Sequence, residues 1–545
     1  MRFVSGISVF VALAASSVGV GCGDDFTCEE AANCTGTGAS GGTDGGTGAT
    51  GGSSGTGGTG ASGGTDGGAG AGGSSGSGGD GGGCDTTKSP GSEACLVSDD
   101  YGVFVSTAGS DSAAGTQGAP VATIKKGVEL AVAAGKKVYV CSDGTTPYKE
   151  QVVLGAPFDG LSIHGGFDCS DWSYGTKTAK IEGPATAWKV ESIPTRVLIE
   201  DFEVTSADAE KNGSSFGMIV ANSNGVELVR TTVTAGKGGD GDDGSAGTKG
   251  SGGATAGAAQ NGKNAECATA TAFLGGGEWT ADSACGSRGG KGGSAVKEST
   301  GTKGNAGTPN INVTPPGADN GGNAGLTGVA GTQGSPGNAG ANGAAAATVG
   351  SFSATGYTPA NGADGKAGFP GQGGGGGGAS NAIVASTCIG ASGGAGGMGG
   401  CGGTLGSGGK GGGASVALLS INSKVRLEDA TLTASAGGKG GNGGQGGVGG
   451  DGAQGGLGGT SGSTALGKGG NGGEGGKGGP GGSGSGASGG ASFAVVWSVT
   501  QPTEVGAVTL TGGNGGAAGT GGQVPGGVKA PDGAVGQAGQ TYEQN

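Results

Sequence analysis

The chain has 545 residues, of which 150 are glycine, 13% are charged and 4% are aromatic. Ordinary globular chains have about 7% glycine and about 25% charged residues, so the few apolar residues here exclude one large core and must be concentrated in part of the chain. The formal net charge, 28 − 42 = −14, comes with thinly spread lysines and argues against nucleic acid as a partner.

The N-terminus has the pattern of a secretory signal, with one arginine, an apolar run and then small residues. Its end, GVGC, resembles the processing site of bacterial lipoproteins, matching at Val20, Gly21 and Cys22 but departing at Gly19, where an aliphatic residue is usual. The resemblance implies that residues 1–21 are a signal peptide and that Cys22 carries lipid. We therefore expect an exported protein, anchored in the outer membrane or at the cell surface. Ordinary secretion and an uncleaved membrane anchor are the alternatives, although the run is short for a membrane span.

The cysteine count agrees with export. If Cys22 carries lipid, ten of the 11 cysteines remain, an even number that indicates disulfides in an oxidising compartment. Connectivity stays open, and the simplest hypothesis pairs close neighbours: Cys28 with Cys34, Cys84 with Cys95, Cys141 with Cys169, Cys267 with Cys285 and Cys388 with Cys401. A zinc site is a weak alternative, because the chain has no CxxC pair and one histidine, His164. No metal or cofactor is expected.

Composition divides the rest of the chain into four parts. A short cysteine-containing segment, residues 22–34, leads into residues 35–83, which are almost entirely Gly, Ser, Thr, Ala and Asp. That composition predicts a flexible tether. Residues 84–235 have an ordinary composition and are predicted to form the first folded domain. Residues 236–545 are a glycine-rich repeat region interrupted by short apolar segments.

Residues 84–235 begin with one strand and one helix. Val103 to Val105 form an apolar strand pattern, and residues 122–134 place apolar side chains on one face of a short helix that Gly135 ends. Only short strand patterns follow, among them KVYVC, LSIHG and RVLIEDFEV, recurring every dozen or so residues between turn residues. Regular spacing of this kind predicts an all-β domain.

Three stretches of this domain resemble the start of bacterial right-handed parallel β-helix proteins with the pectin-lyase-like fold. They are GSDSAAGTQGAPVATIKKGVELA (109–131), KKVYVC (136–141) and LSIHGGFDCSDW (161–172). The resemblance implies a solenoid of stacked coils with the early helix as a cap at one end. Stacked coils bury small aliphatic side chains in a central column and need such a cap.

Four apolar segments, which begin at Ser214, Ala379, Ala414 and Ala491, interrupt the glycine-rich chain and resemble one another. Three of them share A-S-x-A followed by two apolar residues, and three end in a T-x-T step that runs into glycine. We expect all four to be further coils of the same solenoid, with the glycine blocks as loops that leave its side.

The glycine blocks have a three-residue period. Glycine recurs at every third position in residues 238–253 and 322–343, which matches the three residues per turn of a polyproline II helix. A collagen triple helix is not favoured because these blocks contain few prolines. They resemble the glycine-rich repeats of PE-PGRS proteins, a likeness that covers the repeats alone and implies packed layers of such helices but no function. Anchored at both ends to a rigid solenoid, the blocks are expected to pack; unanchored, they would remain coil.

The resemblance also admits an enzymatic role, because β-helix proteins include polysaccharide lyases and hydrolases. The candidate acids are Asp159, Asp168, Asp171, Glu200, Asp201 and Glu203. Paired carboxylates facing one cleft are what a glycosidase requires, but these residues fall in turn and corner patterns, and the surroundings of His164 match no hydrolase motif. The sequence therefore favours a non-catalytic, surface-exposed lipoprotein with a structural or adhesive role and no catalytic residues. Its expected partners are the membrane, through the lipid, and glycans of the cell surface or matrix. A carbohydrate-active β-helix enzyme is the alternative.

Overall fold

The computed structural model describes residues 84–545 except 268–271, 349, 383–386 and 463–465. The expected signal peptide, the tether and Cys22, Cys28 and Cys34 lie outside the described residues. The described part is mostly β, with one α-helix, α1 (Ile124–Ala134). Three short 3-10 helices also occur in it: Ala94–Leu96, Ala156–Phe158 and Ala258–Gln260.

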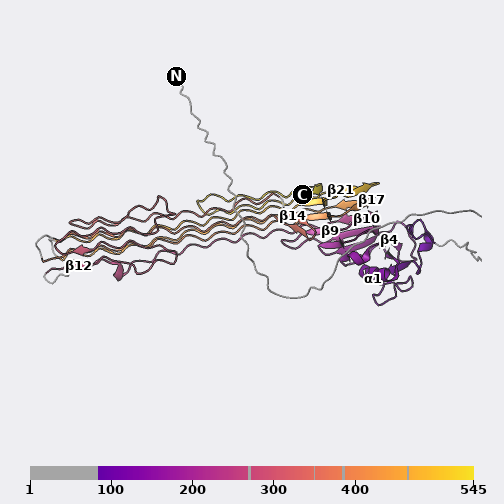
Figure 1. The fold of residues 1–545 in the computed structure, drawn as a ribbon, viewed down its shortest axis with the longest axis horizontal. Coiled ribbons are helices and arrows are strands. Elements are labelled where there is room, and N and C mark those ends of the chain that lie inside the picture. The colour runs from indigo at the N-terminus through magenta and orange to yellow at the C-terminus, as the bar shows by residue number, and fades with distance from the viewer. Residues whose placement is uncertain (1–83, 268–271, 349, 383–386, 463–465) are drawn as a thin grey trace, which may run out of the picture. The chain divides into compact units, whose positions relative to one another are not determined.

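Three parallel sheets form the β part (Figure 1). The seven-stranded sheet has the order β1 (Gly102–Val105), β2 (Lys137–Ser142), β4 (Ser162–Asp168), β7 (Val197–Glu200), β10 (Val226–Val229), β17 (Val425–Glu428), β20 (Thr503–Val505). The six-stranded sheet has the order β3 (Val152–Leu154), β6 (Thr186–Glu191), β9 (Ser215–Ala221), β16 (Ser415–Ile421), β19 (Ser492–Ser498), β22 (Ala538–Glu543). The five-stranded sheet has the order β5 (Ala179–Gly183), β8 (Phe202–Ser206), β11 (Thr232–Thr234), β18 (Thr431–Thr433), β21 (Thr509–Thr511).

From β2 onward, consecutive strands of the three parallel sheets belong to different sheets, as in stacked coils. The chain passes from β9 to β10 to β11, each in another sheet, and the next three strands after the first long glycine excursion, β16 to β18, pair with them in the same order. The register places Met218 beside Leu418 and Leu418 beside Val495. The expectation that the segments from Ser214, Ala414 and Ala491 stack on one another is therefore confirmed.

The core lies between the three sheets, and α1 packs against it beside the first strands, β1 and β2. Aliphatic residues from every sheet form one buried cluster, which includes Ile124 and Val128 of α1. The helix begins where Thr123 accepts a hydrogen bond from the Lys126 amide (3.1 Å) and ends at Gly135, whose φ of 65° is left-handed. The predicted strand and helix are confirmed, with the helix starting two residues later than expected because Thr123 has an extended backbone (φ −114°, ψ 145°) and serves as the N-cap.

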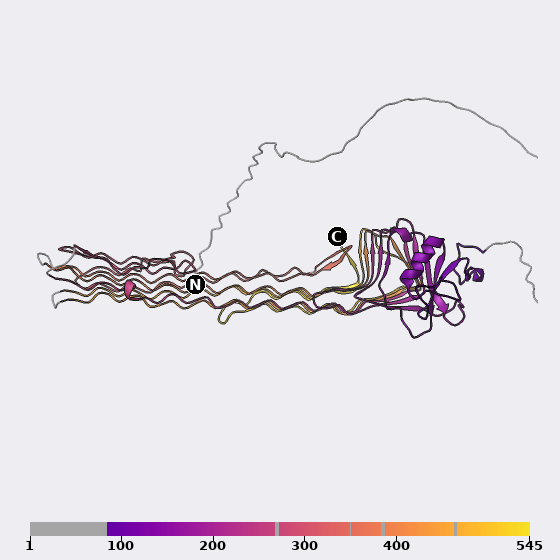
Figure 2. The ribbon, with the colours of Figure 1, turned by 90° about the horizontal axis from the view of Figure 1, so that it is seen from below.

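The glycine excursions run side by side as extended segments joined by hydrogen bonds between segments (Figure 2). Every third amide of residues 444–459 donates to residues 392–407, which run in the opposite direction, as in Gly447 to Thr404 (2.8 Å). Every third amide of residues 238–253 donates to residues 436–451, which run in the same direction. The three-residue period of the sequence is therefore the period of the contacts between segments. We call residues 236–413, 435–491 and 512–537 together the glycine bundle.

The segment from Ala379 is not a coil, and this expectation is wrong. β9 and β16 are direct neighbours in their sheet, which leaves no place for a coil between them. Ser380 and Ile389 instead form isolated bridges with Gly325 and Glu266 inside the glycine bundle. Two small antiparallel pairs also lie outside the three sheets: β12 (Phe273–Leu274) with β13 (Ala295–Val296) and β14 (Ser351–Ser353) with β15 (Gly356–Thr358).

Four disulfides lie within the described residues, and only two of them join chain neighbours. Cys84 pairs with Cys95 and Cys141 with Cys169, as expected. The neighbour pairing is wrong for the other four cysteines, because the structure joins Cys267 to Cys388 and Cys285 to Cys401. The excursion between β11 and β16 folds back on itself, so cysteines more than 100 residues apart become spatial neighbours.

Candidate functional site

A polar cluster lies on the face of the seven-stranded sheet that points away from the common core. Side chains alternate along a strand, and Ile163 of β4 belongs to the core, so His164 points to the other face. The strand register aligns His164 with Tyr139 of β2 and Glu200 of β7. Residues 84–101, which we call the N-terminal segment, cover this face. The Tyr139 hydroxyl donates to the Leu96 carbonyl (2.8 Å), and the Ser89 hydroxyl donates to Glu200 (3.3 Å).

Arg230 is the centre of the cluster. Its Nε donates to Asp201 Oδ1 at 2.7 Å, and its Nη2 donates to Glu200 and to the Tyr174 hydroxyl, the latter at 2.9 Å. The Tyr174 hydroxyl donates in turn to Asp201. Burial alone would raise the pKa of Glu200, but the hydrogen bonds from His164 and Arg230 and the charge of Arg230 outweigh it and lower the pKa to about 2. Glu200 is therefore ionised at neutral pH, and the same guanidinium pairs with Glu200 and Asp201.

His164 is fully buried and uses one ring nitrogen. Its Nδ1 lies in a short hydrogen bond with Glu200, whereas Nε2 has no partner among the described residues. Burial lowers the pKa of His164 despite the adjacent carboxylate. The neutral imidazole that results donates from Nδ1–H to the carboxylate, a bond that fixes its tautomer.

The other acids weighed from the sequence are separated from this cluster. Asp159 accepts the amides of Thr195 and Arg196 at 2.9 and 3.0 Å. Asp168 accepts the Ser170 amide (2.9 Å) and pairs with Lys177 (2.9 Å), interactions that lower its pKa to about 2. These carboxylates stabilise turns.

Two remaining candidates also have local partners. Asp171 accepts the amide and hydroxyl of Ser173. Glu203 lies 3.6 Å from Lys180 on the next coil. Of the six acids, the structure therefore brings only Glu200 and Asp201 together with His164.

Sequence reasoning missed Arg230 and Tyr174 as members of the cluster. The signal for Arg230 was present, because VLIED (197–201) and VELVR (226–230) align as successive strands and place Arg230 beside Asp201. Nothing local marked Tyr174, which reaches the cluster from the loop after β4.

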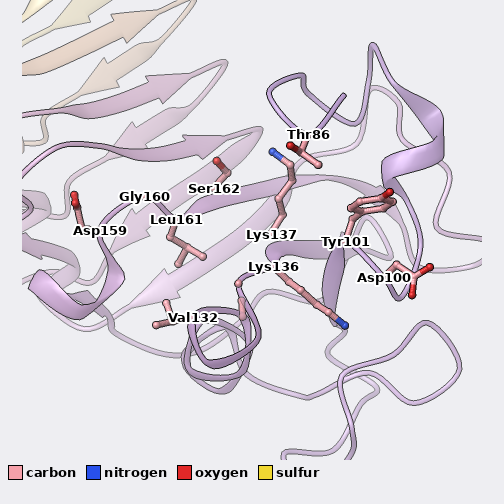
Figure 3. A pocket seen from close by; sticks show the side chains of 12 residues that line it. Thr86, Asp100, Tyr101, Val132, Lys136, Lys137, Asp159, Gly160, Leu161 and Ser162 are labelled. Carbon is pink, nitrogen blue, oxygen red and sulfur yellow. The ribbon is translucent and has the colours of Figure 1, made fainter. Parts of the chain in front are cut away.

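A pocket of about 330 Å³ lies beside the end of α1 (Figure 3). Residues from α1, β2, the start of β4, the loop before β4 and the segment before β1 line it, among them Val132, Lys137, Leu161 and Ser162. In Figure 3 the Lys137 ammonium points toward Thr86, whereas Lys136 extends in the opposite direction.

A search of the described residues found no group of three or more His, Cys, Asp or Glu side chains placed to hold a metal ion. It likewise found no helix with the length and hydropathy needed to cross a membrane. Comparison of the chain with protein families, with curated proteins and with solved structures gave no match.

Proposed function

We propose that this protein is a non-catalytic surface module with a structural or adhesive role, in which a right-handed β-helix holds a bundle of polyproline-II-type glycine helices. One observation supports the proposal most: the hydrogen bonds between glycine segments recur every third residue over long stretches, such as residues 238–253 and 444–459. Such a bundle orders a long polar chain with few side chains, because both ends of each excursion continue directly into strands of the stacked coils.

The carboxylates support a structural role in this proposal. Glu200 and Asp201 are nine-tenths or more buried, and Arg230 forms an ion pair with each of them. A general acid or nucleophile needs a carboxylate that faces substrate, and these two face a guanidinium under the N-terminal segment.

The proposal includes export and a lipid at Cys22, which would attach the module to a membrane through the segment of residues 35–83. Glycans of the cell surface or matrix are the proposed adhesive partners. The support is the composition: a polar surface with few charges and a sequence start typical of lipoproteins.

Incubating the purified chain with acidic and neutral polysaccharides tests the proposal. Retention on a glycan without cleavage is expected for an adhesive module. Cleavage that is abolished by Asp201→Asn or Asp168→Asn would establish the alternative, a carbohydrate-active enzyme. Asp171→Asn is the matched control, since Asp171 caps a similar turn outside the cluster. For the anchor, Cys22→Ser should release the protein from sedimenting membranes.

A further inference from the structure

We propose that the pocket beside the end of α1 binds a small organic carboxylate with a short aliphatic body, and that Lys137 pairs with the carboxylate. This inference does not depend on the proposed adhesive role. It rests on an unpaired cation, on neighbouring polar groups that can donate, and on an apolar wall, all lining one pocket of about 330 Å³. Pockets of about 300 Å³ and above are the usual size for small ligands.

The first argument is the contrast between two adjacent lysines. Lys136 donates to the Asp99 carbonyl at 2.6 Å. The ammonium of Lys137 has no hydrogen bond and no ion pair among the described residues, although the side chain is only partly exposed. Burial lowers the pKa of Lys137, and the charge of Arg196 lowers it further. A bound anion would stabilise the charged ammonium in this place.

Neither acid that lines the pocket serves as the counter-ion of Lys137. Asp159 already accepts two amides and the Thr195 hydroxyl (2.7 Å), so its oxygens are committed. Asp100 is exposed to solvent and forms no ion pair with Lys137. The pocket therefore has room for an anion from outside.

The other residues that line the pocket indicate the chemical groups of the proposed ligand. Ser162 can donate its hydroxyl proton into the pocket, since its oxygen only accepts a long contact from Arg196 (3.5 Å). Val132 and Leu161 form an apolar wall beside it (Figure 3). A carboxylate accepts from both an ammonium and a hydroxyl, and a short aliphatic group would cover the wall.

The test uses the full chain at pH 7 with 3-methylbutanoate, its neutral amide 3-methylbutanamide, and acetate as probes. Modification of Lys137 by an amine-reactive reagent is followed by mass spectrometry. We expect the acid to protect Lys137 and the amide to leave it reactive. Equal protection by acid and amide, or protection by neither, would overturn the proposal, and this arm needs no variant.

The second arm measures affinity by ligand-observed NMR. Lys137→Met should weaken 3-methylbutanoate binding at least tenfold, because the charged partner is lost. The matched control Lys180→Met removes a lysine of β5 that pairs with Glu203 elsewhere, and should bind as the unmodified chain does. Acetate should bind more weakly than 3-methylbutanoate. Unchanged affinity in Lys137→Met would show that the anion lies elsewhere, and equal affinity for both acids would contradict the role of the apolar wall.

Discussion

Gly447 and Thr248 lie so close that a Cβ on Gly447 would stand 1.9 Å from the Thr248 carbonyl oxygen. The two residues belong to different segments of the glycine bundle, and neighbouring glycines repeat the relationship, as in Gly441 with Asp242 (2.0 Å). Backbones can approach this closely only when the side chain is a hydrogen atom. Glycine at every third position is therefore a packing requirement of the bundle.

Substituting Gly447 by alanine should disturb the bundle, because the Thr248 carbonyl belongs to the backbone and cannot turn aside. We expect a loss of about 1–3 kcal/mol in the free energy of unfolding, the usual range for overpacking. Gly252→Ala is the matched control in the same bundle, where the nearest atom to the added Cβ is the Asp451 oxygen at 3.5 Å. Urea unfolding of both variants measures the difference. Equal stabilities would contradict the close packing.

The crossed disulfides give a prediction that needs no mutation. A non-reducing digest analysed by mass spectrometry should contain the peptides Cys267–Cys388 and Cys285–Cys401. Reduction should then increase amide exchange in residues 258–308, because each bond closes a loop of more than 100 residues, worth about 4–5 kcal/mol in the chain-entropy account. A peptide that joins Cys267 to Cys285 would contradict the fold-back of this excursion.

The buried cluster predicts an acid-sensitive stability in two steps. The folded pKa of His164 is lowered, so the unfolded chain binds more protons and stability should decrease as the pH falls below about 6.5. Glu200 has a folded pKa of about 2, so a second decrease should begin below about 4.5 and continue toward pH 2.

Unfolding in urea at a series of pH values measures both steps. His164→Asn keeps an N–H donor for Glu200 but has no titrating ring, so it should lose the first step and keep the second. His164 is the only histidine of the chain, which makes the first step assignable. A variant with an unchanged profile between pH 4.5 and 6.5 would show that His164 is not responsible.

Arg230→Met should destabilise the chain by more than an ordinary surface substitution. It would leave two buried carboxylates, Glu200 and Asp201, without their cation, whereas exposed ion pairs contribute only about 0.2–1 kcal/mol. Arg196→Met is the control, because its partner Glu227 lies on the more exposed part of the same sheet. We expect the unfolding midpoint in urea to fall clearly further for Arg230→Met. Similar midpoints would mean that the cluster contributes little.

The parts of the fold that depend on short-range patterns could be predicted from the sequence. Short apolar patterns located the strands, and Gly135 marked the end of the helix, whereas the start of the helix was expected two residues too early. The segment from Ala379 has a similar apolar pattern but lies in the glycine bundle, because its place depends on how a long excursion folds back. The same long-range geometry decides the pairing of Cys267 and Cys285.

The polar cluster could be predicted in part. Glu200 and Asp201 stood out as adjacent acids, but their neighbours depend on strand register between coils. Once VLIED and VELVR are aligned, Arg230 falls beside Asp201. The position of Tyr174 follows from a loop conformation that no local pattern marks, and the unpaired state of Lys137 depends on which acids around it already have partners.

The central claim is that contacts between neighbouring segments order the glycine chain with a period of three residues. Residue-resolved amide exchange of residues 444–456 in the full chain tests it most directly. The amides of 444, 447, 450, 453 and 456 donate to the facing segment, whereas those of 445, 448, 451 and 454 have no hydrogen bond within the described residues. Slow exchange at the first set and fast exchange at the second is the expected result. Uniformly fast exchange would contradict the account.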